Sequence, residues 1–310
     1  MLAFLLLATF TGSDACADCH RGIFDKQARS AHANALRPYA GSPLAARLKG
    51  SITTGPFRLT YSPDSVEAES ASMQLEWSFG SGTQAYTGVG RNAANWIEHR
   101  ISLYTASSRL SLTPGHFGRQ IVNASDALGI IQDPPTIARC FNCHAARTRA
   151  TAQGVDLSRI EPGVKCERCH GPGSDHIAAA KAGRTETLGR SLLNSGRFSA
   201  RASVQVCGEC HRTPPARDAS PTPELDDPLS VRFQPVGLMA SRCFQVSAKL
   251  SCLTCHDPHD SLLRDKDFYN SRCLTCHNQH EEPGRPDCIS CHMPRGSPAP
   301  HLSFTDHRIR

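Results

Sequence analysis

The chain has 310 residues, among them 15 Cys and 15 His, with a formal net charge of +6 and a mean hydropathy of −0.36. This hydropathy, together with the absence of any run of about 18 apolar residues, excludes a membrane-spanning protein. Charged residues are only 20% of the chain and apolar residues occur throughout, which excludes a disordered protein, and a His count equal to the Cys count is not typical of a disulfide scaffold.

Apolar side chains are scarce for a chain of this length, which allows one large domain or two. Hydrophobic residues make up 39% of the chain and aromatic residues 6%. We therefore expect something other than side chains to fill part of the interior. Of the 34 basic residues, 28 are Arg and six are Lys. Such a basic balance is typical of proteins that bind nucleic acid or an anionic surface.

Residues 1–13 resemble a secretory signal peptide. Met1 to Ala8 form a short apolar run, followed by the small polar residues Thr11-Gly12-Ser13. The run is too short to span a bilayer, and the basic residues that usually precede such a run are missing. An apolar N-terminal strand is the alternative. Cys16 lacks the preceding apolar residue that a lipidation signal requires.

The pattern Cys-x-x-Cys-His begins directly after this segment and occurs seven times. Its copies are Cys16/Cys19/His20, Cys140/Cys143/His144, Cys166/Cys169/His170, Cys207/Cys210/His211, Cys252/Cys255/His256, Cys273/Cys276/His277 and Cys288/Cys291/His292. This is the attachment signature of c-type haem. Two thiols three positions apart each add to one vinyl group of a haem, and the next His supplies an axial imidazole to the iron.

Zinc ribbons and thioredoxin-like redox sites fit the pattern less well. Zinc ribbons pair two Cys-x-x-Cys units for each metal and need no His after every second Cys. A thioredoxin-like redox site is usually a single motif. The pattern therefore predicts seven covalently attached haems. Because covalent haem requires a compartment outside the cytoplasm, it also predicts a periplasmic or extracellular protein.

The stretch between the first two motifs carries no haem signature. A helix is expected over 23–36, and it would carry His32. Further on, apolar and polar residues alternate in four segments, which predicts a small antiparallel sheet or meander. These segments are Phe57–Tyr61, Gln74–Phe79, Gln84–Val89 and Trp96–Tyr104. Gly80-Ser-Gly82 and Gly88-Val-Gly90 are expected to be turns, and Gln132–Thr136 marks a boundary.

Six motifs then follow within residues 140–292. Short helices are expected at 137–147, 175–183 and 200–209, and the Pro-rich stretch Thr213–Pro228 is expected to be an exposed loop. The predicted organisation is a signal-like segment over 1–13, a single-haem region with a strand-rich insert over 14–135, and a six-haem region over 136–310. The predicted fold class is α+β with much irregular structure, packed around haem.

Eight further histidines can supply sixth ligands to seven irons. His32, His176, His259, His301 and His307 are the favoured candidates, and His116 and His280 are open. His99, on a predicted strand, is more typical of an exposed structural residue. Ligation by His on both sides gives low-potential centres, whereas Met239 or Met293 would raise the potential. Cys243 belongs to no motif and is expected to be a buried, inert thiol. One haem with an open iron would be the place for catalysis.

Four segments make the chain resemble the cytochrome c554-like group of multihaem cytochromes c. They are Gly163–His176, Leu253–His259, Cys288–Pro294 and Thr305–Ile309, within residues 136–310. The resemblance implies an extracytoplasmic electron carrier whose haems stack in parallel and perpendicular pairs. It also implies that His176, His259 and His307 are distal ligands. It implies nothing about the strand-rich segment or the physiological partner.

The predicted function is electron transfer along seven haems, mostly with two His ligands, between redox partner proteins. One alternative is an oxidoreductase that acts on a small nitrogen or sulfur compound at an open haem. Another is a cytochrome that assembles into a conductive filament or oligomer. The excess of Arg is expected to compensate the negative charge of haem propionates, because planar Arg donors suit carboxylates. Nucleic acid is therefore no longer an expected partner. No nucleophile motif or phosphate-binding loop appears.

Overall fold

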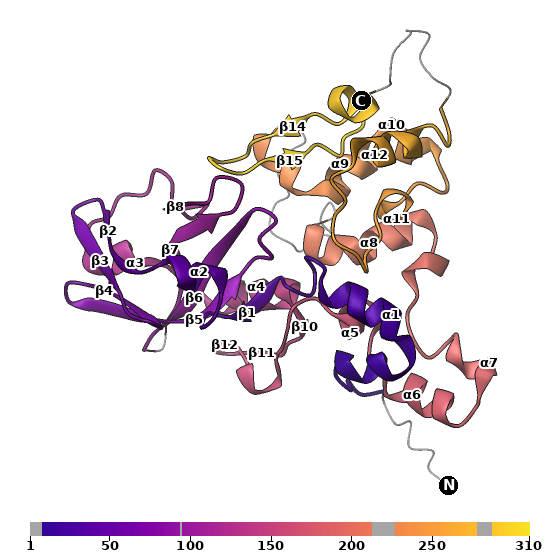
Figure 1. Cartoon of the computed structure of the whole chain (residues 1–310), viewed down its shortest axis with the longest axis horizontal. Coiled ribbons are helices and arrows are strands. Elements are labelled where there is room, and N and C mark those ends of the chain that lie inside the picture. Colours follow the sequence, from indigo (N-terminus) through magenta and orange to yellow (C-terminus); the bar gives the residue numbers. More distant parts are fainter. Residues whose placement is uncertain (1–7, 94, 213–226, 278–286) are drawn as a thin grey trace. The chain divides into compact units, whose positions relative to one another are not determined.

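The computed structural model describes residues 8–93, 95–212, 227–277 and 287–310. The chain forms two compact units, Met1–Leu192 and Leu193–Arg310. This division by compactness differs from the division by motif density expected above, which stays a prediction. Most of the signal-like run, His280 and most of the Pro-rich stretch lie outside the described residues. Figure 1 shows the ribbon of both units.

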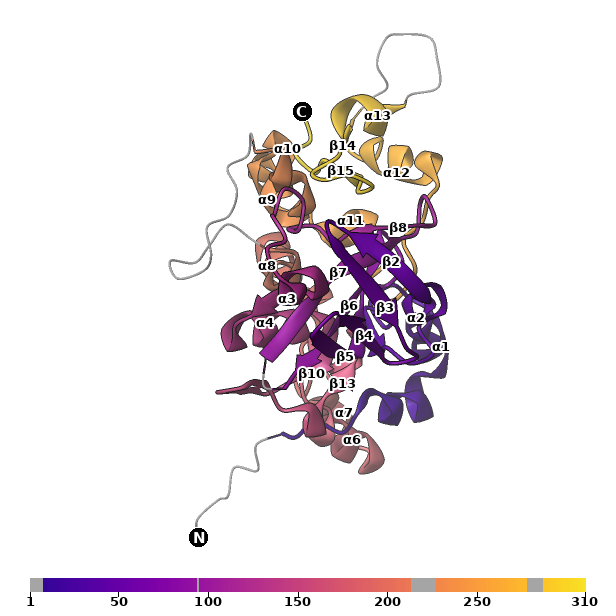
Figure 2. The ribbon, with the colours of Figure 1, turned by 90° about the vertical axis from the view of Figure 1, so that its left-hand side faces the viewer.

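The first unit contains a nine-stranded antiparallel sheet in its described part. Seven strands follow one another as a meander in the order β2-β3-β4-β5-β6-β7-β8, while β1 pairs with β5 and β9 pairs with β7 (Figures 1 and 2). The strands are β1 Leu36–Pro38, β2 Gly50–Thr54, β3 Phe57–Tyr61, β4 Ser65–Ala68, β5 Ala71–Phe79, β6 Ala85–Asn92, β7 Asn95–Tyr104, β8 Arg109–Leu112 and β9 Gly129–Gln132. The expected mixed fold with an antiparallel segment is confirmed.

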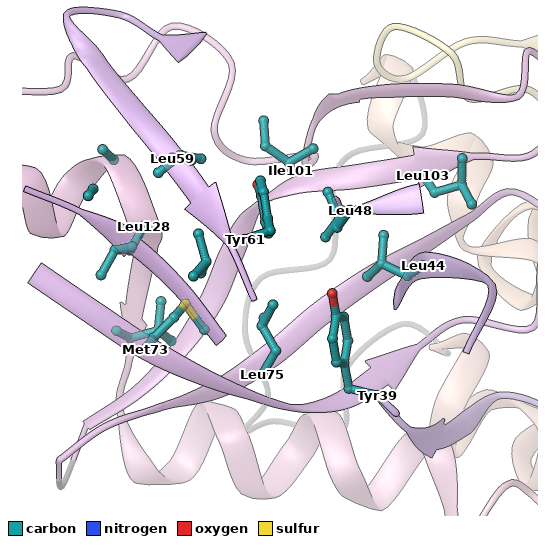
Figure 3. Packing of buried hydrophobic residues seen from close by; sticks show 14 of the residues in the cluster. Tyr39, Leu44, Leu48, Leu59, Tyr61, Met73, Leu75, Ile101, Leu103 and Leu128 are labelled. Atoms are coloured by element: carbon teal, nitrogen blue, oxygen red, sulfur yellow. The ribbon is translucent and has the colours of Figure 1, made fainter. Parts of the chain in front are cut away.

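Both faces of strand β7 are buried, because the sheet packs on two sides. Side chains alternate along a strand. Ile97, Ile101 and Leu103 therefore share one face and join a cluster that includes Leu44 of α2 (Pro43–Arg47) and Leu128 of α3 (Ala124–Leu128). Figure 3 shows this core, with Tyr39 and Tyr61 among its residues. Trp96, on the other face, belongs to a second cluster together with the helix that carries the second motif.

Gly88-Val-Gly90 was expected to be a turn, and this prediction is wrong. Both glycines lie inside strand β6. A Cβ on Gly90 would lie within bonding distance of the Gln74 carbonyl, and one on Gly88 would lie 3.0 Å from the Leu75 side chain. The two glycines therefore let β6 approach β5 closely. Short periodicity with glycine does not distinguish such a close approach from a turn.

The helices of the first unit are short. They are α1 Ala17–Ala28, α2, α3, α4 Pro134–His144, α5 Cys166–His170, α6 Ser174–Lys181 and α7 Thr185–Leu188, with 3-10 turns η1 Ser13–Cys16 and η2 Leu157–Arg159. Two small hairpins complete the unit, formed by β10 Ala145–Arg147 with β13 Glu161–Pro162 and by β11 Ala150–Thr151 with β12 Gly154–Val155. The helix expected at 175–183 corresponds to α6. The helix expected at 137–147 corresponds to α4 but extends too far, because Ala145–Arg147 form β10.

The helix expected over 23–36 is wrong in its extent. Helix α1 ends at Ala28, and β1 begins at Leu36. The Asn34 amide donates hydrogen bonds to the carbonyls of Ala28 and Ser30, at 3.0 and 2.9 Å, which satisfies carbonyl groups at the helix end. His32 therefore lies in the turn after the helix.

The second unit is built of short helices with a small apolar cluster. Its elements are η3 Ser195–Arg197, α8 Ala200–His211, η4 Pro228–Arg232, α9 Gln234–Ala240, α10 Arg242–Val246, α11 Cys252–Cys255, α12 Lys266–Cys273, α13 Cys288–His292, β14 Arg295–Gly296 and β15 Phe304–Thr305. The cluster contains Val204, Leu238 and Phe244. The short helices leave much of this unit without regular structure, as expected.

Candidate haem sites

Each of the seven motifs lies on a short helix or at the end of one. The motif fills α5 and α13, forms the last turn of α4 and α8, and lies at or beside η1/α1, α11 and α12. Positions i and i+3 share one face of a helix, so helical geometry turns both thiols of a motif to the same side. The following His often ends the helix, as His144 and His211 do. This is the arrangement that attachment of one haem by two thioethers requires.

All 15 cysteines lie in the described residues, and none of them forms a disulfide. Burial, followed by the charge of Glu98, raises the pKa of Cys140 to about 11. Burial also raises the pKa of Cys255. These two thiols therefore remain protonated near neutral pH, as expected for cysteines that are largely enclosed in protein.

The second cysteines of the motifs are less enclosed than the first cysteines, all of which are half-buried. Among the second cysteines, the structure leaves four exposed, namely Cys19, Cys169, Cys276 and Cys291, and three half-buried, namely Cys143, Cys210 and Cys255. At the four exposed positions the described residues do not enclose the thiol that a haem vinyl group would meet. Attachment of haem at these second cysteines stays a prediction from the motif.

The sixth motif is the most open of the seven. Cys276 and His277 are both exposed, and Cys273, at the end of α12, is half-buried. His277 N donates to the Cys273 carbonyl at 3.0 Å, so the chain makes one further turn after the helix. His277 is also the last described residue before the gap at 278–286. The structure thus places its backbone at the motif turn, and iron binding by His277 stays a prediction.

First cysteines of different motifs contact each other in the structure. The Cys16 thiol contacts that of Cys166, and burial together with Cys166 raises the pKa of Cys16 to about 12. The thiol of Cys252 interacts with that of Cys207, and this interaction together with burial raises the pKa of Cys252. The Cys273 thiol likewise interacts with that of Cys288; burial and Cys288 raise the pKa of Cys273 to about 11. Motifs one and three, four and five, and six and seven are thus neighbours.

Two motif histidines face a histidine from a distant part of the chain. The ring centres of His20 and His176 lie 6.2 Å apart with planes 23° from parallel. His256 and His307 also lie 6.2 Å apart, with planes 37° from parallel. An imidazole nitrogen binds a metal at about 2.0 Å and lies about 1.1 Å from its ring centre, so two imidazoles on opposite sides of one metal place their centres about 6.2 Å apart. The distance between ring centres in both pairs therefore equals that expected for two axial imidazoles.

The tautomers of several histidines suit metal binding at Nε2. Nδ1–H of His144 donates to the Ala35 carbonyl at 2.9 Å, and Nδ1–H of His307 donates to the Thr305 carbonyl at 2.9 Å. Because a carbonyl only accepts, Nε2 carries the lone pair that a metal needs. Burial lowers the pKa of both imidazoles, which keeps them neutral. The same use of Nδ1 occurs at His176, toward Ser191 Oγ at 3.2 Å, and at His292, toward the Arg310 carbonyl.

The second motif is inserted into the aromatic side of the sheet. Phe141, between its two cysteines, is fully buried. Its ring meets the edges or faces of Trp77, Phe79 and Trp96, with ring centres 5.7, 5.0 and 5.5 Å away. Phe79 also contacts His144, at 5.1 Å. The sheet therefore positions the second motif through direct packing.

His116 is fully buried, and neither of its ring nitrogens has a hydrogen-bond partner. Its Nε2 lies 3.6 Å from Oε2 of Glu98. The charge of Glu98 also contributes to the raised pKa of Cys140, which places this pair beside the second motif. A buried imidazole without partners is costly unless something else satisfies it, so His116 fits a ligand of the second haem.

His99 has a structural role. Its Nε2 lies 2.9 Å from the Tyr61 hydroxyl, and its Nδ1 lies 2.7 Å from the Leu128 carbonyl. Both ring nitrogens are occupied, so no lone pair is left for iron. The expectation of an exposed residue is wrong, because His99 is fully buried within the sheet.

The remaining candidates lie near the surface or in turns. His32 follows α1, and its carbonyl accepts from Val164 N at 2.8 Å. The His259 side chain is 39% exposed and lies 3.4 Å from Asp257. His301 is exposed, in a loop with a φ of 65°. Sequence reasoning missed Glu98 and also Glu167, a buried residue between two motif cysteines. The Cys-x-x-Cys-His pattern allows any residue at position 167, so the motif gave no indication of a role for Glu167.

Part of the chain is similar to a known protein family. Residues 116–171 match the family of cytochrome c554 and c-prime, a span that begins at His116 and takes in the second and third motifs. No curated protein sequence matches the chain significantly. The chain therefore resembles a multihaem cytochrome c of the c554-like group, and the comparison supports a haem-based electron-transfer protein.

A solved structure shares the fold. The chain is similar to the outer cell wall cytochrome OcwA, with a TM-score of 0.58 and 15% sequence identity over 97% of this chain and 79% of that one. At this identity the likeness concerns the fold. Among the described residues, no helix is both long enough and apolar enough to cross a membrane.

Proposed function

We propose that this chain is an exported cytochrome that binds seven c-type haems and carries electrons along them. The observation that carries the proposal is that two pairs of imidazoles have ring centres spaced for one iron between them. These pairs are His20 with His176 and His256 with His307. A haem with imidazole on both sides has no open position for a substrate. Such a centre exchanges electrons with its neighbours and binds nothing else.

The residues of the chain have distinct tasks in this proposal. The 14 motif cysteines would hold the haems through thioether bonds, and the seven motif histidines would supply one axial imidazole each. His176, His307 and His116 would supply axial imidazoles from outside the motifs. His32, His259, His280 and His301 stay predicted ligands. Hydrogen bonds at Nδ1 orient His144, His176 and His307 for this task. When bound, haem iron accepts and releases one electron at a time.

The contacts between motifs support a defined haem order within each unit. In the first unit, the thiol contact joins motifs one and three, and Arg168 Nε donates to the Asn142 carbonyl at 3.2 Å, which joins motifs three and two. The proposed order there is one, three, two, which differs from the chain order.

In the second unit, thiol contacts join motif four to five and six to seven, and Cys255 acts electrostatically on Cys273 across motifs five and six. The proposed order is therefore four, five, six, seven. Since each thiol is a few bonds from a porphyrin edge, neighbouring haems would lie close enough for direct electron transfer. The protein's contribution is this spacing, together with ligation and burial.

Two measurements on the purified protein test the proposal. The intact mass should exceed that of the processed chain by seven haems, and paramagnetic resonance of the ferric protein should contain mainly low-spin signals. The ferrous protein should bind little carbon monoxide. A mass increase of fewer haems would contradict the count. A dominant high-spin signal, or carbon monoxide bound at several haems, would contradict the assignment as an electron carrier.

A second candidate function is catalysis at the second haem. It is favoured by the buried imidazole of His116 and the half-buried carboxylate of Glu98 beside the second motif. If the second iron were open, these groups could exchange protons with a small nitrogen or sulfur compound. Turnover of hydroxylamine, nitrite or tetrathionate, lost in His116→Ala, would support this function. A low-spin second haem without turnover would exclude it.

Assembly into a filament has less support. The first motif lies far along the chain from the others, an arrangement that would allow a His of a neighbouring protomer to ligate its haem. Its thiol contacts the third motif of the same unit, however, and its histidine faces His176. Electron microscopy of the native protein would decide, since ordered fibres would favour assembly and isolated monomers would exclude it.

A further inference from the structure

We infer that Glu167 is a positioning residue that holds His176 opposite His20. The inference rests on the proposed ligation of the first haem by these two histidines, in an exported chain that retains residues 9–12 after removal of the apolar run before them. Glu167 lies inside the third motif, directly after Cys166, and is only 3% exposed. A residue between two haem cysteines needs only to act as a spacer. A buried carboxylate at this position is costly unless it is fully hydrogen-bonded.

The Glu167 carboxylate binds the segment that precedes the first motif. Thr11 N donates to its Oε1 at 2.9 Å, and Gly12 N donates to its Oε2 at 2.8 Å. The Thr11 hydroxyl lies a further 3.3 Å from Oε1. Hydrogen bonds to an ionised acceptor are the stronger kind, so this segment is fixed against the third motif.

The same carboxylate also binds the start of the helix that carries His176. Gly173 N donates to Oε1 of Glu167 at 2.8 Å, in a buried hydrogen bond. Gly173 is the N-cap of α6, and His176 lies in the first turn of that helix. One side chain therefore connects the approach to His20 with the helix that presents the opposing imidazole.

Hydrogen bonds near Glu167 join the same two segments. Thr9 N donates to Ser174 Oγ at 2.8 Å, and Ser174 N donates to the Thr9 carbonyl at 3.2 Å. A Cβ on Gly173 would lie 3.3 Å from Oε1 of Glu167, which shows how closely the backbone approaches the carboxylate. Without the carboxylate, three N–H groups would lose their acceptor, and only the Thr9–Ser174 hydrogen bonds would join α6 to the segment before the first motif.

The fourth motif supplies a matched control. Glu209 also lies between two motif cysteines, but it is exposed. If a glutamate inside a motif served only haem attachment, Glu167→Ala and Glu209→Ala would behave alike. If Glu167 positions His176, only Glu167→Ala would change the ligation of one haem.

The test compares the full haem-loaded chain with variants Glu167→Ala, Glu167→Gln, Glu209→Ala and His176→Ala by paramagnetic resonance and haem content. We expect His176→Ala to convert one haem to high spin, and added imidazole to reverse the change. We expect Glu167→Ala to convert the same haem with the haem content unchanged. In Glu167→Gln, which keeps one acceptor oxygen, we expect a smaller shift of that haem's signal. Glu209→Ala should match the unmodified protein.

Two results would overturn the inference. If His176→Ala produces high-spin haem while both Glu167 variants keep the original spectrum, the ligand pair stands and the positioning role fails. If His176→Ala itself keeps the original spectrum, the proposed ligand pair fails and the inference fails with it. Should Glu167→Ala not accumulate as a haem protein, Glu167→Gln decides alone, and an unshifted spectrum overturns the inference.

Discussion

Phe141 is the residue through which the sheet holds the second motif, and Phe141→Ala tests that role. The ring is fully buried and contacts three other aromatic rings at 5.0 to 5.7 Å. Truncation of a buried Phe costs about 3–5 kcal/mol of unfolding free energy. Aromatic pairs add about 0.5–1.5 kcal/mol beyond area burial, so three of them place this site at the upper end, about 4–5 kcal/mol.

The expected result is a large fall in the melting temperature of the first unit. For a unit of about 190 residues, each kcal/mol corresponds to about 2–4 °C, so Phe141→Ala should lower the melting temperature by about 8–20 °C. Calorimetry of the ferric protein measures this directly. The transition of the second unit, if it is resolved, should not move.

The control is Phe198→Ala, which removes a ring that is 38% exposed. Its cost should be within about 0.5 kcal/mol, as is usual for surface substitutions. A fall of less than about 4 °C for Phe141→Ala, or an equal fall for both variants, would refute the view that this ring attaches the second motif to the sheet.

Three further predictions concern single side chains. His307→Ala should open the iron opposite His256, so that the reduced protein binds one more carbon monoxide than the unmodified protein; no additional binding would exclude this ligand pair. Cys243→Ser should leave the haem count by intact mass unchanged, because Cys243 belongs to no motif, and a lost haem would show that it takes part in attachment. Burial lowers the pKa of His99 to about 4, below its ordinary value of 6.5. The unfolded chain therefore binds this proton more readily, and the stability of the first unit should be full above about pH 6.5 and fall by on the order of 3 kcal/mol toward pH 4. Urea midpoints at several pH values check this, and an unchanged acid dependence in His99→Gln would contradict it.

The sequence predicted those features that depend on local periodicity. Phe57–Tyr61 alternates apolar and polar side chains, and it forms strand β3 with the same bounds. The segments at 74–79, 84–89 and 96–104 likewise became parts of β5, β6 and β7. Alternation succeeds here because one sheet face must be buried for the strand to be stable.

Features that depend on distant contacts could not be predicted in the same way. The partner of His176 is His20, more than 150 residues earlier, and no spacing rule relates them. Gly90 looks like a turn residue until the Gln74 carbonyl is seen where its side chain would be. Glu167 occupies a variable position of its motif, and its burial and its hydrogen bonds to Thr11 and Gly173 are contacts that no local pattern predicts.

The contacts between thiols of different motifs have a consequence for biosynthesis. Two cysteines held in contact in an oxidising compartment are candidates for a disulfide. A chain that folded before it received haem would bring Cys207 to Cys252 and Cys273 to Cys288, and oxidation there would remove both cysteines of each pair from haem attachment. If these cysteines carry haem, their attachment would therefore require a reductant and a chain that has not yet brought the paired thiols together.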